Sequence, residues 1–248
     1  MVTVEDGRET ERPLSITMRT PGNDFELAVG FLFGEGLVRG RADLDRVVYC
    51  ATSVVEQEYN VVSVILREGV SYDPTRLERH VYTTSACGVC GKTSLDAVRV
   101  QTSSEIPRDR PRVRSRVVAG LPDRLRAGQE IFAETGGLHA AGLFDAAGGL
   151  HGLREDVGRH NAVDKLVGSQ VFEGRVPLND SILGVSGRAS FEILQKAAVA
   201  GIPFVVAVGA PSNLAVDLAK EFGMTLVGFA RGEAFNVYSG GHRIIEGP

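Results

Sequence analysis

The strongest constraint on the fold is a set of short, continuous apolar runs in the second half of the chain. They are residues 182–185, 204–208 and 226–229. Strands without polar alternation are buried on both faces, so helices must cover both sides of the sheet that they form. Helical patterns at 189–200 and 213–222 separate the runs, and each is followed by glycine, which commonly closes a helix. This half is therefore predicted to be an α/β layer with right-handed crossovers.

The first half has a mixed pattern that is typical of a small α+β unit. A helix is predicted from Asn23 to about Gly36, with Asn23 and Glu26 at the spacing of a capping box. Two β-rich runs follow at 47–51 and 59–66, and the second alternates as a half-buried antiparallel strand does.

An arginine-rich stretch separates the two halves. Between Thr102 and Ala119 the chain has five arginines and two prolines with few apolar residues, so we expect a linker or an exposed strand. We place the domain boundary there, with a small α+β domain over residues 1–116 and an α/β domain over 117–248. In the larger domain, a helix around 123–135, a hairpin over 138–153 and a helix over 158–171 precede the apolar runs.

Charge and composition exclude several classes of protein. The net charge is −4, so no general basic field exists to hold nucleic acid or an anionic membrane. No run approaches the roughly 18 apolar residues of a membrane span. The first residues are charged rather than apolar, and three cysteines cannot all pair, so we expect a cytoplasmic protein with free thiols.

Two of the cysteines, Cys87 and Cys90, form a CxxC motif within Ala86–Thr93. Two thiols at this spacing are able to share a metal, form a disulfide or carry sulfur as a persulfide. A zinc site needs four ligands, and no second pair of ligands follows in the sequence, so zinc is not expected. The flanking glycines favour an exposed loop that hands an atom between partners, and inert cysteines would be expected among apolar neighbours.

Polar side chains gather where helices begin and strands end. On the helix starting near Gly158, His160 and Asp164 lie four residues apart and share a face, and Arg159 adds positive charge to the helix start. Ligands of open α/β sheets bind at the carboxyl ends of strands, which is where the turns at 186–190 and 229–234 fall. We expect the turn at 186–190 and the first turn of the helix near Gly158 to line one pocket.

Simpler structural roles are open for the same residues. Asp156 is also placed to cap a helix and His160 to be a surface group. Glu192 and Lys196 have the spacing of an exposed i,i+4 pair, and the turn at 229–234 is also that of an ordinary hairpin.

Together these stretches resemble the FdhD family of sulfur carrier proteins that are needed for active formate dehydrogenase. The resemblance rests on six segments, which occur in the family's order over nearly the whole chain: SACGVCGKTS, TGGLHAAGLFD, REDVGRHNAVDKLVG, SGRASFEILQKA, APSNLAVDLA and LVGFARG. It implies that sulfur passes from a cysteine desulfurase to Cys87 as a persulfide, with Cys90 assisting. The acceptor is then the metal of Mo-bis(molybdopterin guanine dinucleotide), before that cofactor enters formate dehydrogenase. It also implies a homodimer.

The family's larger domain is similar to the cytidine deaminase fold, and the predicted α-β-β-α-β-α-β order agrees with it. A zinc deaminase needs His-x-Glu at one helix start and Pro-Cys-x-x-Cys at the next. This chain has His160-Asn161-Ala162 and Gly187-Arg188-Ala189-Ser190 there, so the general acid/base and two of the zinc ligands are missing. We therefore expect the chain to share the deaminase scaffold but to catalyse a different reaction.

The predicted site has two parts, a catalytic pair and a cofactor-binding set. The catalytic pair is Cys87 and Cys90. The cofactor-binding set is Arg159, His160, Asn161, Asp164, Ser186, Gly187, Arg188, Ser190, Phe229, Ala230, Arg231, Gly232, Glu233 and Ala234. We expect GDP to mimic the bound cofactor. The alternative function is a chaperone that binds the guanine dinucleotide cofactor without carrying sulfur.

Overall fold

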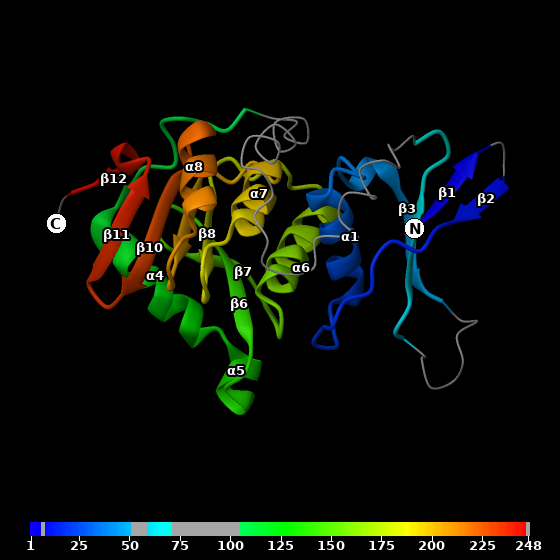
Figure 1. The fold of residues 1–248 in the computed structure, drawn as a ribbon, viewed down its shortest axis with the longest axis horizontal. Coiled ribbons are helices and arrows are strands. Elements are labelled where there is room, and N and C mark those ends of the chain that lie inside the picture. Colours follow the sequence, from blue (N-terminus) through cyan, green and yellow to red (C-terminus); the bar gives the residue numbers. More distant parts are fainter. Residues whose placement is uncertain (6–7, 51–58, 71–104, 247–248) are drawn as a thin grey trace.

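The larger unit is built on a mixed six-stranded sheet in the order β11-β10-β9-β8-β6-β7 (Figure 1). The computed structural model describes residues 1–5, 8–50, 59–70 and 105–246. The strands are β6 (His139–Phe144), β7 (Leu150–Asp156), β8 (Ile182–Val185), β9 (Phe204–Ala207), β10 (Thr225–Arg231) and β11 (Ala234–Ser239). The central strands β8, β9 and β10 are parallel, and β6, β7 and β11 are antiparallel to their neighbours.

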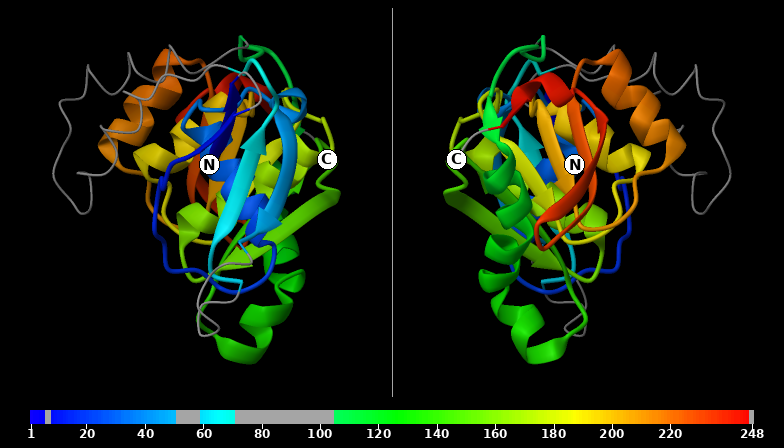
Figure 2. Two further views of the ribbon diagram at one scale, coloured as in Figure 1. Left: turned by 90° about the vertical axis from the view of Figure 1, so that its right-hand side faces the viewer. Right: turned by 90° about the vertical axis from the view of Figure 1, so that its left-hand side faces the viewer.

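Helices cover both faces of this sheet, as the apolar runs require. The helices are α4 (Ser115–Ala127), α5 (Glu130–Thr135), α6 (Arg159–Phe172), α7 (Phe191–Val199) and α8 (Asn213–Glu221). In β9, Phe204 and Val206 pack into the cluster on the α4 face, and Val205 joins the opposite cluster with α6, α7 and α8. Figure 2 shows α4 and α8 on opposite sides of the sheet. The predicted three-layer α/β fold is confirmed.

The smaller unit is a four-stranded sheet with one helix. Its strands are β1 (Val2–Glu5), β2 (Arg8–Glu11), β3 (Leu44–Tyr49) and β4 (Val62–Leu66), in the order β2-β1-β4-β3. The β3–β4 pair is antiparallel, as predicted. Helix α1 (Asp24–Gly34) lies between this sheet and α6 (Figure 1).

The two units share one hydrophobic core. A single apolar cluster contains Val29 and Phe33 of α1, Leu66 of β4 and Val163 of α6. The short strand β5 (Val113–Arg114) pairs with β12 (Ile244–Ile245), close to the C-terminus. The two large sheets therefore come from different halves of the chain, whereas the apolar core is continuous across the boundary predicted at residue 116.

The closest contact between the units is the crossing of α1 and α6. A Cβ atom on Gly30 would lie 1.8 Å from the carbonyl oxygen of Asp164, and one on Gly168 would lie 1.9 Å from that of Glu26. No side chain fits at either position, so each helix backbone rests directly on the other.

The predicted helix over 123–135 is two helices, and the first begins earlier than expected. Helix α4 starts at Ser115, inside the stretch that we expected to be a linker or an exposed strand. Its buried stripe of Val118, Leu121 and Leu125 has helical spacing, while the arginines at its start face solvent. Pro122 lies inside the helix and interrupts the pattern that would have predicted it.

The predicted capping box at the start of α1 is wrong. Asn23 precedes the helix in a left-handed conformation with φ 56°, and its side chain makes no capping hydrogen bond. The Glu26 carboxylate instead accepts a 2.8 Å hydrogen bond from Arg154 of β7. An ion pair with a distant residue replaces the predicted capping hydrogen bond, because β7 brings Arg154 within reach of the first turn of α1.

The helix crossing predicts that two glycine substitutions have opposite effects on the free energy of unfolding. Gly168→Ala should lower the free energy of unfolding by about 3 kcal/mol, because the added methyl group must separate two packed backbones. Gly120→Ala in α4 has nothing within 4 Å of its added Cβ and should raise stability by about 0.5–1 kcal/mol. Urea unfolding measures both, and equal stabilities would contradict the crossing.

Candidate functional site

A cavity of about 560 Å³ opens at the edge of the sheet where the parallel strands end. Its first wall comes from the strand ends, with residues 136–139, Ser186, Val208 and 230–232. Its second wall comes from α4 and α5 and includes Arg126, Gln129 and Phe132. The predicted residues Ser186, Ala230, Arg231 and Gly232 thus line one space, together with His139 at the start of β6, the strand next to β8.

A second group of predicted residues lies where α6 and α7 begin. The His160 Nε2 atom is 2.9 Å from the Ser190 hydroxyl oxygen and 3.8 Å from a Glu192 carboxylate oxygen. Gly187 brings the end of β8 close to this group, because a Cβ there would lie 3.2 Å from His139 Nδ1 and 3.8 Å from Arg159 Cδ. His139 therefore connects this group to the cavity.

The two histidines are held in their neutral form. Burial, followed by the charge of Arg159, lowers the pKa of His160 from 6.5 to about 4. The same two causes lower the pKa of His139. The Arg159 Nε atom is itself buried and has no hydrogen-bond partner among the described residues. Near neutral pH the group thus holds the positive charge of Arg159 beside two uncharged imidazoles, with the Glu192 carboxylate at its exposed side.

Two predicted residues on α6 are engaged within the protein. The Asn161 side-chain amide donates to the Met18 carbonyl at 2.8 Å and to an Asp156 carboxylate oxygen at 2.9 Å. Asp164 is buried against Lys196, with 2.7 Å between the carboxylate oxygen and Nζ. Burial raises the pKa of Asp164 to about 6. Neither residue lines the cavity.

The interpretation of Lys196 as an exposed partner of Glu192 is wrong. Lys196 is buried between α7 and α6, and its ammonium pairs with Asp164. Helical spacing told us that the two side chains share a face, but it could not show that α1 and α6 cover that face.

The remaining predicted residues are exposed at the surface. Arg188 is exposed beside Gly209, where an added Cβ would lie 3.0 Å from Arg188 Cγ. Glu233 and Ala234 are exposed at the β10–β11 turn. Phe229 is 51 % exposed with φ 53°, so it presents an aromatic ring to solvent near the cavity residue Ala230.

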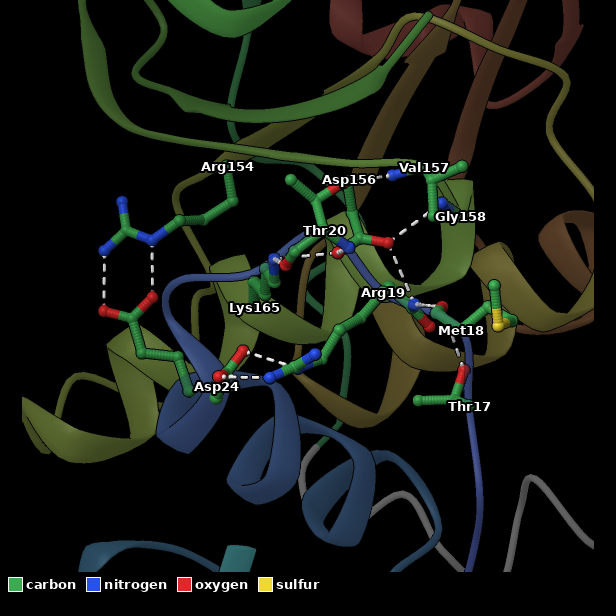
Figure 3. A network of polar contacts seen from close by, with 12 residues as sticks. Thr17, Met18, Arg19, Thr20, Asp24, Arg154, Asp156, Val157, Gly158 and Lys165 are labelled. Atoms are coloured by element: carbon green, nitrogen blue, oxygen red, sulfur yellow. Dashed lines mark hydrogen bonds and ion pairs between the residues drawn. The ribbon is translucent and has the colours of Figure 1, made fainter. Parts of the chain in front are cut away.

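The position of the α6 start is set by a buried ion pair (Figure 3). The carboxylate of Asp156 lies 2.7 Å from Lys165 Nζ, and neither side chain is more than 1 % exposed. The same carboxylate accepts the backbone N–H of Thr20 at 3.0 Å, and Lys165 donates to the Thr20 carbonyl at 2.8 Å. Asp156 also accepts the Gly158 N–H at 2.9 Å. The pair therefore fixes both the helix start and the N-terminal segment beside it.

Sequence reasoning missed the helical wall of the cavity. Arg126 lies over the ring of Phe132, with 3.7 Å between the guanidinium carbon and the ring centroid, and Gln129 lies in the turn between α4 and α5. Phe132 and Arg126 were within the predicted helix, but nothing in their spacing placed that helix at the strand ends.

The predicted catalytic pair, Cys87 and Cys90, lies outside the described residues, as does the whole CxxC motif. The third cysteine, Cys50, follows β3, and its N–H donates to the Val61 carbonyl at 2.9 Å. Within the described ranges, no group of three or more histidine, cysteine or acidic side chains is placed to hold a metal ion. None of the helices in those ranges is long and apolar enough to cross a membrane.

Comparison with known proteins gives a consistent result. The model of the FdhD/NarQ family matches residues 9–245. A relative named sulfur carrier protein FdhD from Streptomyces avermitilis is 57% identical over 236 residues, which cover 94% of this chain and 84% of that protein. One of the same name from Mycobacterium tuberculosis is 51% identical over 94% of this chain and 86% of its own length.

A solved structure shares the fold over almost the whole chain. The crystal structure of a protein from Desulfotalea psychrophila, assigned as a formate dehydrogenase accessory protein, matches with a TM-score of 0.69 and 25% identity. The match covers 98% of this chain and 87% of that one.

The neutral state of His160 predicts how stability varies with pH. The folded protein holds a pKa of about 4 where the unfolded chain has about 6.5, so only the unfolded state takes up this proton within that window. The free energy of unfolding should therefore decrease as the pH is lowered from 6.5 towards 4. His160→Gln has no imidazole to protonate, so its stability should decrease less over the same pH range. Urea unfolding of both proteins at pH 7.5 and 5 measures the difference, and parallel profiles would contradict a buried neutral His160.

Proposed function

The chain belongs to the FdhD/NarQ family, and on that premise we propose that it is a sulfur carrier serving formate dehydrogenase, with Cys87 as the carrying thiol. The observation that carries the proposal is the cavity at the strand ends, because its lining offers groups that could bind the phosphates and the base of a nucleotide. Glycine turns, Ser186 and Arg231 lie on one wall, and a stacked Arg126–Phe132 pair lies on the other.

Sulfur loading is proposed as an exchange between a thiolate and a persulfide. The Cys87 thiolate attacks the outer sulfur of a persulfide on the donor, a cysteine desulfurase. The donor's S–S bond breaks as the new S–S bond on Cys87 forms, and the donor cysteine leaves as a thiolate. No net oxidation occurs, so the step needs no co-reactant. Cys90, three residues away, assists as the second thiol of the pair.

The proposed acceptor is the metal of Mo-bis(molybdopterin guanine dinucleotide), bound as substrate. Its phosphates need local positive charge because the protein as a whole carries −4. Arg231 on the cavity and Arg159, beside the neutral His139, supply that charge, with Arg188 exposed nearby. On transfer to a Mo(IV) centre, Cys87 leaves as its thiolate, and the metal, oxidised to Mo(VI), supplies the two electrons that reduce the outer persulfide sulfur to sulfide.

The remaining expectations belong to the same proposal. We infer that the protein acts in the cytoplasm as a homodimer, and that formate dehydrogenase receives the sulfurated cofactor. GDP is the simplest mimic of the acceptor's nucleotide end and is the ligand to use in binding measurements. Zinc has no part in this scheme.

Substitution of the carrier thiol tests the proposal directly. After incubation with a cysteine desulfurase and cysteine, the wild-type protein should gain about 32 Da per sulfur carried, as a persulfide does. Cys87→Ala should gain nothing and support no formate dehydrogenase activity, while Cys50→Ala should load as the wild type does. Mass spectrometry of the intact proteins measures the loading.

The alternative cofactor chaperone makes the opposite prediction for formate dehydrogenase activity with Cys87→Ala. A protein that only holds the guanine dinucleotide would deliver active cofactor after Cys87→Ala. Cys87→Ala should also bind GDP as the wild type does, which separates loss of the thiol from loss of the fold. Maturation of active enzyme by Cys87→Ala would therefore remove Cys87 from the carrier role.

A further inference from the structure

Gln129 is a buried polar side chain at the wall of the cavity. It is 4% exposed and lines the cavity, and its Nε2 atom has no hydrogen-bond partner among the described residues. Leaving a buried donor unpaired costs about 1–3 kcal/mol, and most buried polar groups in proteins are paired. An unpaired amide at the wall of a cavity is therefore a feature that a ligand would complete.

The surrounding structure holds Gln129 in place. Its backbone N–H donates to the Arg126 carbonyl at 3.2 Å, and its carbonyl accepts the Ala133 N–H at 3.2 Å. The start of α5 is anchored in turn by Glu155 of β7, whose carboxylate accepts the N–H groups of Ile131 and Phe132 at 2.9 and 2.8 Å. The backbone of Gln129 is thus fixed by both helices, and the start of α5 by the sheet.

The wall around Gln129 suits a planar aromatic ring. Arg126 and Phe132 are already stacked face to face, and Pro122 and Leu125 add apolar surface to the same wall. Aromatic and guanidinium faces are the groups on which nucleobases stack. The opposite wall, with Arg231 and the glycine turns, suits phosphates.

We propose that Gln129 is the residue that selects guanine, by donating a hydrogen bond from Nε2 to the O6 carbonyl of the base. This inference rests on the proposed function, which supplies the guanine nucleotide. Adenine carries an amino group where guanine carries O6, so it would bring a second donor against Nε2, and it could pair there only if the carboxamide rotated to present Oε1 as an acceptor. A site built around a buried hydrogen bond discriminates strongly against a ligand that cannot make it.

Two substitutions of Gln129 test the proposal with GDP and ADP as probes. Gln129→Met keeps the volume and removes the donor, so the Kd for GDP should rise about tenfold while that for ADP stays unchanged. Gln129→Glu replaces the donor with an acceptor, so GDP should weaken and ADP should bind more tightly. Isothermal titration calorimetry on the full chain measures all six pairs.

The melting temperature of the free protein distinguishes a role of Gln129 in binding the base from a role in stabilising the fold. Because Nε2 has no hydrogen-bond partner among the residues that the structure describes, Gln129→Met should melt at the same temperature as the wild type or higher. A lower melting temperature, or a loss of ADP binding equal to that of GDP, would overturn the role in selecting the base. Unchanged GDP affinity in Gln129→Met would do the same.

Failure of the underlying function gives a different result. If the wild-type protein bound no guanine nucleotide, the cavity would lose its place in the proposed function, and this inference would be overturned with it. If the wild type bound GDP, loaded sulfur on Cys87 and showed no effect of Gln129→Met, only the present inference would be wrong.

Discussion

The structure depends on one close contact, the crossing of α1 over α6 at Gly30 and Gly168. Because neither residue has a side chain, the N-terminal helix rests on the backbone of the helix that carries Arg159 and His160. The buried Asp156–Lys165 pair holds the preceding segment against the same helix start. Packing within the N-terminal third of the chain therefore sets the geometry at the edge of the larger sheet.

Charges in this region divide into those that build the fold and those that face the site. Lys165, Lys196 and their carboxylate partners are buried and paired, and breaking such pairs is costly because it leaves an uncompensated charge. Arg159 is different, since its buried Nε has no partner among the described residues and its charge adds to burial in keeping two histidines neutral. The positive potential at the site therefore comes from a few side chains, on a protein that is acidic overall.

The cavity combines two kinds of surface that the chain supplies from distant places. The strand ends contribute glycine turns and Arg231. The wall of α4, α5 and the turn between them contributes a stacked arginine and phenylalanine and the Gln129 amide, whose Nε2 has no partner in the described part of the chain. A ligand with a planar base and phosphates would use both walls at once. That division links the proposed acceptor, which carries guanine nucleotides, to a recognition residue outside the motifs of the family.

The sequence by itself determined the α/β layer, since continuous apolar runs separated by helices leave no other way to bury both faces of a sheet. It also placed Ser186 and Arg231 at the same sheet edge, because parallel strands end together. Only the tertiary structure decided that Asp164 and Lys196 are buried partners and that Gln129 faces the cavity. Helical periodicity states which residues share a face, but the partner that covers the face comes from distant parts of the chain.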